Sequence, residues 1–248
     1  MSKLRYQTLR ENVAKVIREK ILNKELKPGM RIIEQNLSDE LEVSRGPIRE
    51  ALRQLEQEGV VEYTRNVGCS VKEITIKDLY EIYLLRSTYE ILAVKLCGGQ
   101  FEQEDIERME EVLENMKDLK NYEEVVMCDN VLHSIFVEKG DFQRIKKVWS
   151  DLDYGSIVSC YITGFDEQKT VERQYEFHKK LVEACKTRDV DIICEELRNH
   201  YMNSVRYFME AEGLPEDSFN VEGHFFRKIA GMENQKLYKI IGKTLTQR

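Results

Sequence analysis

The chain has 248 residues, of which 42% are hydrophobic and 33% charged, and its formal net charge is −7. This composition suits one large or two modest domains with packed cores, and no apolar run is long enough to cross a bilayer, which excludes a membrane-spanning protein. The N-terminus lacks the apolar core of a signal peptide, and the six cysteines include no CxxC pair, so we expect a cytoplasmic protein with reduced thiols. The three prolines and the many charged residues indicate a mostly helical fold.

Charge divides the chain into two unlike parts. Residues 1–70 contain 13 Lys and Arg against 11 Asp and Glu, a net charge of +2, whereas the remainder carries −9. A polyanionic partner is therefore expected only for the N-terminal part.

The first seventy residues predict three helices and then a β-hairpin. Apolar residues at helical spacing predict helices over residues 6–24 and 34–41, and a third helix from Ser44 to Gly59. Runs of β-branched residues on both sides of the turn at residues 66–68 predict the hairpin. This order of elements is typical of a winged helix-turn-helix.

The third predicted helix opens on an unusual Gly-Pro pair. Ser44 is a good N-cap residue, so Gly46 and Pro47 fall within the first turn, where a missing N–H group and a fixed proline φ are tolerated. Gly59 is expected to end the helix.

Three arginines lie on one face of the same helix. Arg45, Arg49 and Arg53 are four residues apart, opposite an apolar face. Such a stripe alone is more often a solvated surface, but a helix in this context enters the major groove, where arginine donors match guanine. The candidate DNA-binding residues are Ser44, Arg45, Gly46, Arg49, Arg53, Gln35 and, at the hairpin, Arg65, Asn66 and Gly68.

The segment "KPGMRIIEQNLSDELEVSRGPIREALRQLEQEGVVEY" resembles the DNA-binding domain of GntR-family bacterial transcription regulators. The resemblance implies binding to an operator in double-stranded DNA. The family usually has Thr where this chain has Gly46, and often an Arg where Gln35 stands, which implies a missing contact and a different operator preference.

From Ile74 onward the patterns predict only helices. We expect a helical effector-binding, metal-binding and dimerisation domain over residues 74–213, after a DNA-binding domain over 1–73, and a C-terminal helical extension over 214–248. The expected helices cover residues 76–98, 103–118, 121–138, 142–163, 167–186, 189–211 and 220–244.

Three histidines and an aspartate are expected to meet inside this bundle. Asp129 and His133 are four residues apart on an apolar helix face. His178 and His200 lie equally far from Asp189 in the predicted turn of a helical hairpin, so they should be neighbours. Each histidine alone would more often be a core residue, but together they suit a divalent metal, with zinc first and nickel or manganese as alternatives.

The segments "LYEIYLLRSTYE", "DNVLH" and "FHKKLVEACKTRDVDIICEELRNH" resemble the FCD effector-binding domain of the FadR branch of GntR regulators, over roughly residues 74–210. The resemblance implies that Asp129, His133, His178 and His200 bind a divalent metal, and that a small carboxylate effector often completes the coordination. Arg86 should point inward and needs an anion, which is either Glu90 at i+4 or the effector carboxylate.

The sequence thus predicts a transcription regulator that binds a palindromic operator as a homodimer and has no catalytic residues. Two alternatives stay open. The bundle could be a metal-dependent hydrolase with an accessory DNA-binding domain, although no general base is clearly placed. It could also serve only for dimerisation, with its histidines as core residues.

Overall fold

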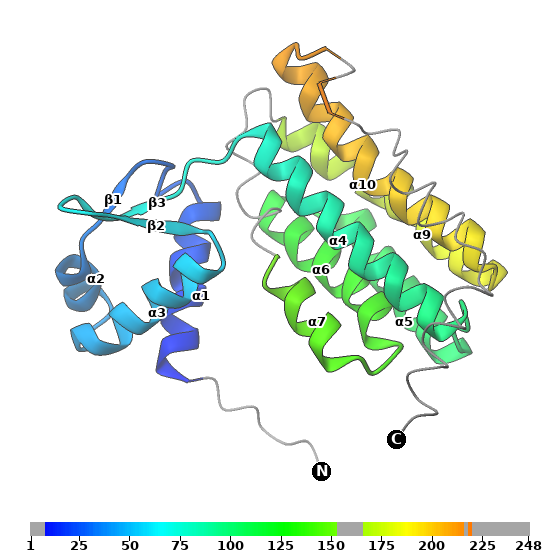
Figure 1. Cartoon of the computed structure of the whole chain (residues 1–248), viewed down its shortest axis with the longest axis horizontal. Helices are drawn as coiled ribbons and strands as arrows, with labels where there is room; N and C mark the ends of the chain where they lie inside the picture. The colour runs from blue at the N-terminus through cyan, green and yellow to red at the C-terminus, as the bar shows by residue number, and fades with distance from the viewer. Residues whose placement is uncertain (1–7, 153–165, 216–217, 220–248) are drawn as a thin grey trace, which may run out of the picture.

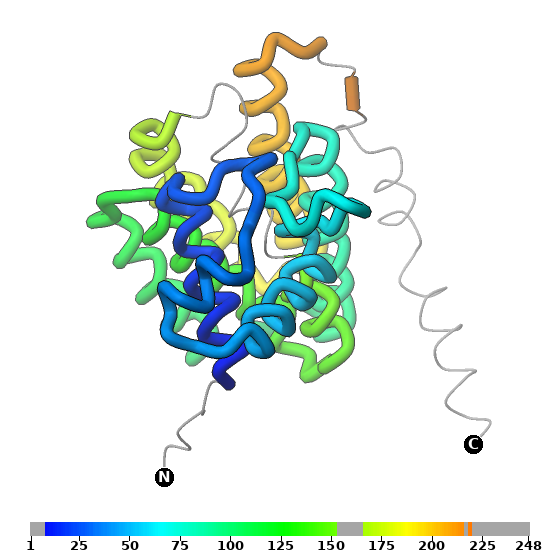
Figure 2. The backbone as a smooth tube through the Cα atoms, turned by 90° about the vertical axis from the view of Figure 1, so that its left-hand side faces the viewer, coloured from blue at the N-terminus to red at the C-terminus, as the bar shows by residue number. Residues whose placement is uncertain are grey.

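The structure is a computed structural model that describes residues 8–152, 166–215 and 218–219. A small N-terminal lobe of three helices and a sheet lies beside a larger, all-helical lobe (Figure 1). In Figure 2 the molecule is turned by 90°, so that the N-terminal lobe faces the viewer and the helices of the larger lobe lie behind it. The mainly α fold with an N-terminal winged helix-turn-helix is confirmed.

The N-terminal lobe has its three helices close to the predicted bounds. The helix predicted over 6–24 is α1 (Leu9–Leu22), which follows an N-terminal capping box between Thr8 and Glu11; residues 6 and 7 lie outside the described residues. Helix α2 (Glu34–Glu40) and helix α3 (Arg45–Gln57) follow. Ser44 is at the N-cap of α3, as predicted, although its side chain makes no capping hydrogen bond.

The sheet has one strand more than the predicted hairpin. Strands β2 (Val61–Thr64) and β3 (Gly68–Val71) form the hairpin, and β1 (Arg31–Ile32) pairs with β3, which gives the antiparallel order β1-β3-β2. Two residues are too few for an alternating pattern, so the sequence gives no signal for β1. At the hairpin, Asn66 and Gly68 have φ values of +66° and +106°, as the predicted turn requires.

The large lobe is built from long helices connected by short turns. In the described residues these are α4 (Ile76–Cys97), α5 (Gln103–Asn115), the short 3₁₀ helix η1 (Met116–Asp118), α6 (Tyr122–Glu138), α7 (Gln143–Ser150), α9 (Glu167–Thr187) and α10 (Val190–Glu212). The single helix predicted over 142–163 was wrong at residues 151–152, because α7 ends at Ser150 and a turn follows. Residues 153–163 and the helix predicted over 220–244 lie outside the described residues.

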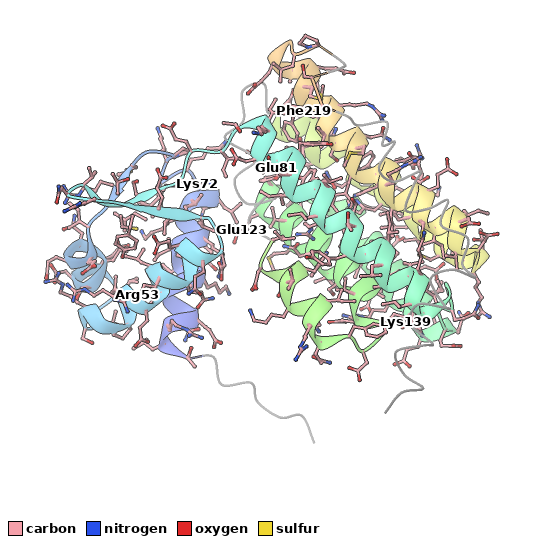
Figure 3. All side chains as sticks on the ribbon, in the orientation of Figure 1. Arg53, Lys72, Glu81, Glu123, Lys139 and Phe219 are labelled. Atoms are coloured by element: carbon pink, nitrogen blue, oxygen red, sulfur yellow. The ribbon has the colours of Figure 1, made fainter. Side chains whose placement is uncertain are left out.

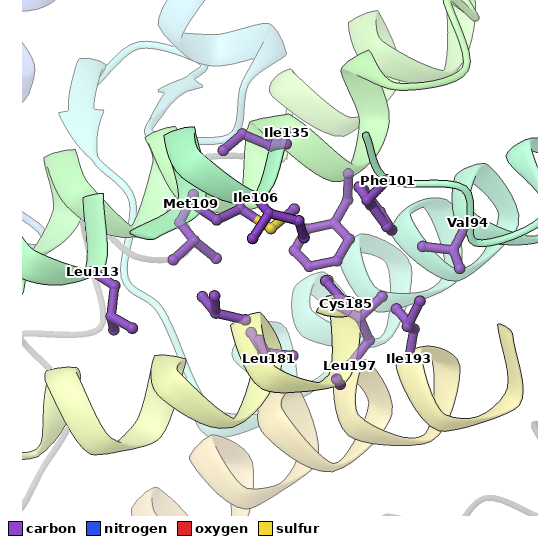
Figure 4. Packing of buried hydrophobic residues seen from close by; sticks show 14 of the residues in the cluster. Val94, Phe101, Ile106, Met109, Leu113, Ile135, Leu181, Cys185, Ile193 and Leu197 are labelled. Atoms are coloured by element: carbon purple, nitrogen blue, oxygen red, sulfur yellow. The ribbon is translucent and has the colours of Figure 1, made fainter. Parts of the chain in front are cut away.

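Helix α10 packs along α4 and against α9, so that α9 and α10 form the expected antiparallel hairpin (Figure 1). Arg188, with φ +57°, and the N-cap residue Asp189 make the tight turn between them. The main core of the lobe fills the space between α4, α5, α6, α9 and α10 (Figure 4). None of the described helices is long and apolar enough to cross a membrane.

The two lobes share part of one apolar core. Tyr122, Val125 and Val126 of α6 belong to the same buried cluster as the residues of α1, α3 and the sheet. Polar contacts accompany this packing, since Glu167 of α9 accepts from the Tyr122 backbone N–H (3.4 Å) and pairs with Lys24 (3.5 Å). Figure 3 shows Glu123, at the start of α6, beside the small lobe. Helix α6 therefore contacts the DNA-binding lobe directly.

Candidate functional site

The N-terminal end of α3 presents two arginines on the surface. The Arg45 and Arg49 side chains are 51% and 54% exposed. Both donate to one carboxylate oxygen of Glu34, Arg45 from Nη2 (3.1 Å) and Arg49 from Nε (2.7 Å). Burial raises the pKa of Glu34, but the two arginines outweigh it and lower the pKa, so the carboxylate stays ionised and orients both guanidinium groups.

The other residues predicted to bind DNA are distributed around this end of the lobe. Gly46 is exposed, and a Cβ added there would meet no atom within 4 Å. Gln35 is exposed and donates to Asp39 (2.7 Å). Arg65 and Asn66 are exposed in the hairpin turn.

Arg53 is placed apart from Arg45 and Arg49. It lines a cleft between the lobes together with Lys147 and Asp151 from α7 and its C-terminal end, and Figure 3 shows it on α3. Its position near the helical lobe separates it from the two arginines at the start of the helix.

The predicted cluster of three histidines and one aspartate forms in the large lobe. Each of the four residues can offer one ligand atom such that all four atoms lie within 4.8 Å of one another. The His178 and His200 rings, on α9 and α10, have centroids 4.6 Å apart, which confirms that they are neighbours. Asp129 and His133 approach from α6, and all three histidines are buried.

The Nε2 atoms point to a common centre. The His133 and His200 Nε2 atoms are 3.1 Å apart, and Asp129 Oδ1 lies 3.1 Å from His178 Nε2 and 3.7 Å from His133 Nε2. Four ligands that surround one zinc ion at about 2.0–2.1 Å in a tetrahedron are about 3.3 Å from one another. These three separations are close to those expected around a single divalent ion.

Hydrogen bonds behind the cluster fix two of the rings. His178 Nδ1 donates to the backbone carbonyl of Gln174 (3.0 Å), and His133 Nδ1 donates to Glu90 Oε2 (2.8 Å). With Nε2 deprotonated, each of these rings would direct a lone pair at the centre, as metal-binding histidines do. His200 Nδ1 is buried and has no hydrogen-bond partner among the described residues.

The charges of the cluster act on one another strongly. Burial raises the pKa of Asp129, but His133 and His178 outweigh it and hold that pKa well below its usual range. Burial, together with the neighbouring His178 and His133, lowers the pKa of His200 well below the ordinary histidine value. Asp129 is therefore anionic and His200 neutral, which is the state in which both bind metals.

Glu90 is a site residue whose role the sequence did not reveal. Besides the His133 contact, its Oε1 accepts from the Trp149 indole N–H (2.7 Å) and from the Tyr201 hydroxyl (2.5 Å). These donors lie 43 to 111 residues away in the sequence, so no local spacing could indicate them.

Arg86 is buried on the same side of the cluster as Glu90. It donates to the Tyr201 hydroxyl (3.2 Å) and to Asn130 Oδ1 (3.3 and 3.2 Å), and its guanidinium carbon lies 4.4 Å from the Trp149 ring centroid. Arg86 is not among the residues that line the cavity next to the histidines.

That cavity, of about 40 Å³, lies between α6, α9 and α10. Asp129, His178 and His200 form one side of it. The rest of its wall mixes apolar and polar side chains: Tyr83, Tyr122, Val125, Val126, Phe177, Phe208, Thr170, Arg173, Gln174 and Ser204. A small ligand in this cavity would directly contact the cluster of three histidines and Asp129.

A winged helix-turn-helix beside a helical lobe with a buried ligand-type site defines a DNA-binding regulator with a sensor domain. Residues 9–71 match the family of bacterial regulatory proteins called gntR, and residues 81–203 match the FCD domain. The chain belongs to the GntR family: it is a DNA-binding transcription regulator with an FCD effector-binding domain, and not an enzyme.

Relatives of known name agree with this assignment. The HTH-type transcriptional regulator YdhC of Bacillus subtilis is 28% identical over 189 residues, which cover 75% of this chain and 84% of YdhC. The gluconate operon transcriptional repressor of Bacillus licheniformis is 27% identical over 196 residues, 76% of this chain and 80% of the repressor.

Solved structures share the fold. Escherichia coli McbR/YncC superposes with a TM-score of 0.66 at 20% identity, over 83% of this chain and 99% of that one. A GntR-type regulator from Rhodococcus sp. RHA1 gives 0.67 at 20% identity, over 82% and 98% of the two chains.

Proposed function

We propose that this regulator holds one divalent metal ion on Asp129, His133, His178 and His200, and that a small carboxylate bound beside the metal controls its affinity for DNA. Zinc is the first choice, since three imidazoles and one carboxylate suit it, with nickel or manganese as alternatives. When bound, the ion would supply a Lewis-acidic position for an effector oxygen.

One contact carries the metal proposal. Because the Gln174 carbonyl can only accept, His178 Nδ1 donates to it, and Nε2 of the same ring lies 3.1 Å from Asp129 Oδ1, which is an acceptor. Two acceptors at hydrogen-bond distance repel each other unless a cation lies between them. A core histidine would need a second proton here, whereas a divalent ion satisfies all four ligand atoms at once.

The carboxylate part of the proposal has separate support. The cavity is lined by three of the four proposed metal ligands, which are Asp129, His178 and His200. One relative is a repressor of a gluconate operon, and gluconate is a small carboxylate. Arg86 remains the candidate for effector binding that the sequence predicts, because of its charge and its position beside Glu90 near the cluster.

Helix α6 links the cluster to the DNA-binding lobe. Its first turns pack in the core of that lobe through Tyr122 and Val125, and its next turns carry Asp129 and His133. A ligand that moves α6 would therefore shift the recognition helix. We expect a homodimer in the cytoplasm, with two α3 helices in successive major grooves of a palindrome.

The test uses the full-length protein and DNA selected by it from a random library. We expect a palindromic sequence, and a change in fluorescence anisotropy binding curves when a chelator removes the metal. A bundle that serves only for dimerisation would give the same curves with and without chelator, and would refute metal control.

A further inference from the structure

Arg173 lies on α9, five residues before His178, and lines the cavity next to the metal-type cluster. Its guanidinium carbon lies 4.1 Å from the Tyr207 ring centroid and 5.4 Å from that of Phe177. Two aromatic rings from two helices therefore hold the guanidinium group in place by cation–π contacts. These contacts hold the half-buried side chain at the cavity.

Within the described ranges no carboxylate forms an ion pair with Arg173, and its Nε is buried without a hydrogen-bond partner. Burial lowers the pKa of Arg173. The side chain as a whole is only half-buried, and its Nε is the part that has neither water nor, among the described residues, a protein group as a partner, which leaves a donor that an anion in the cavity could use.

A second residue of the cavity wall, His200, also has an unpartnered nitrogen among the described residues. Of the three buried side-chain nitrogen or oxygen atoms without a hydrogen-bond partner in the described part of the chain, one is Arg173 Nε and another is His200 Nδ1. Both are donors or potential donors. Arg173 and His200 therefore bring unused hydrogen-bonding capacity, and Arg173 a positive charge, to a small cavity whose wall also includes the anionic Asp129.

The size of the cavity limits which ligands could bind to these unpartnered nitrogens. A water molecule needs about 10–15 Å³ on this measure, so a cavity of about 40 Å³ accommodates a group of a few heavy atoms. A carboxylate has this size, and its two oxygens match the fork of an arginine. Val125, Val126 and Phe177 provide apolar wall for a short hydrocarbon part.

Arg86 differs from Arg173 on these points. Its guanidinium already donates to Asn130 and Tyr201, and it is not part of the cavity wall. An anion inside the cavity would meet Arg173 without any rearrangement.

We propose that Arg173 is the anion-binding residue of the effector cavity, and that it pairs with the carboxylate of a small monocarboxylic acid. This inference rests on the carboxylate effector of the proposed function, and it moves the recognition of that group from Arg86 to Arg173.

The test measures the binding of acetate to the full-length protein. Acetate is the probe because it is the smallest monocarboxylate with a methyl group. Acetate is titrated by calorimetry and by thermal shift, with chloride at matched ionic strength, for zinc-loaded and for chelator-treated protein. The variants are Arg173→Met, Arg173→Lys and Lys169→Met. Lys169 is the matched control, because it lies on the same helix, loses the same charge and has a side chain that is 73% exposed.

We expect acetate to bind the wild type and the Lys169→Met variant equally, and the Arg173→Met variant about tenfold more weakly or worse. Zinc affinity should be the same in all three. Equal acetate binding by wild type and Arg173→Met, or no acetate binding by the wild type in either form, would overturn the inference.

Two further outcomes separate the claims. If the Met variant does not fold, the Lys variant decides, since it keeps the charge and loses the fork: weaker acetate binding supports the inference and equal binding overturns it. If zinc does not bind but acetate binding still depends on Arg173, the metal proposal fails and the anion-binding role stands.

Discussion

The hydrogen bond from His133 to Glu90 offers a sharp test of how the cluster is held ready for a metal. In a Glu90→Gln variant the side chain keeps its shape, and its remaining oxygen can still accept from Trp149 and Tyr201, which both donate to Oε1. The new NH₂ group then faces His133 Nδ1 at the place of Oε2, 2.8 Å away. Two donors would meet there, so His133 must move its proton to Nε2, the atom that would bind the metal.

The expected cost follows from this change of tautomer. Loss of such an outer-shell partner weakens metal affinity about 10–100-fold, which is about 1.4–2.8 kcal/mol. The measurement is zinc competition against a chromophoric chelator at constant pH. The matched control is Glu81→Gln on the same helix, whose side chain is 59% exposed and should leave zinc affinity unchanged.

The result that would refute this reasoning is equally definite. Zinc affinity of the Glu90→Gln variant within twofold of the wild type, in a protein with an unchanged melting temperature, would show that Glu90 does not set the tautomer of His133.

Three further outcomes are expected. An Arg49→Ala variant should bind the selected operator about tenfold more weakly in anisotropy titrations, because the loss of an arginine contact to a base costs about 1–3 kcal/mol, and wild-type affinity would show that α3 is not the recognition helix. A Gly46→Thr variant should bind the same DNA about two- to tenfold more tightly, since the added atoms meet no clash and a hydroxyl can bond a phosphate; unchanged or weaker binding would refute this contact. Zinc affinity should rise with pH: burial lowers the pKa of His133, but Glu90 and Asp129 outweigh it and raise that pKa, so a proton must leave Nε2 before a metal binds. A titration that shows no dependence on pH from 5.5 to 8 would contradict the ligand role of His133.

Local spacing was enough to predict the cluster itself. Asp129 and His133 share a helix face by their separation of four, and His178 and His200 meet because they are equally distant from the turn at Asp189. These relations depend only on helical geometry and on one short connection, which the sequence contains in full. The end of α3 shortly before Gly59 and the turn at Asn66 follow in the same way from residues that accept positive φ.

Contacts between distant elements could not be predicted in this way. Glu90 was expected as a local partner of Arg86, and only the packing of α4 against α6 and α10 brings it to His133 and Tyr201. In the sequence, nothing distinguishes Arg173 from the other charged residues of an amphipathic helix. Its place between aromatic rings depends on the crossing of α9 and α10.

The shared core of the two lobes has the same origin. Val125 and Val126 line the cavity beside Asp129 and also belong to the core of the DNA-binding lobe, and the sequence gives no sign of this second contact. A helical pattern shows which face is apolar and not which neighbour covers it.

The most direct test of the central proposal is the metal content of the purified full-length protein, measured by elemental analysis together with its melting temperature in chelator. We expect close to one divalent ion per chain in the wild type, a lower melting temperature after chelation, and neither property in a His178→Ala variant. Substoichiometric metal in the wild type, with a melting temperature that chelator does not change, would contradict the metal site and leave the three histidines as core residues.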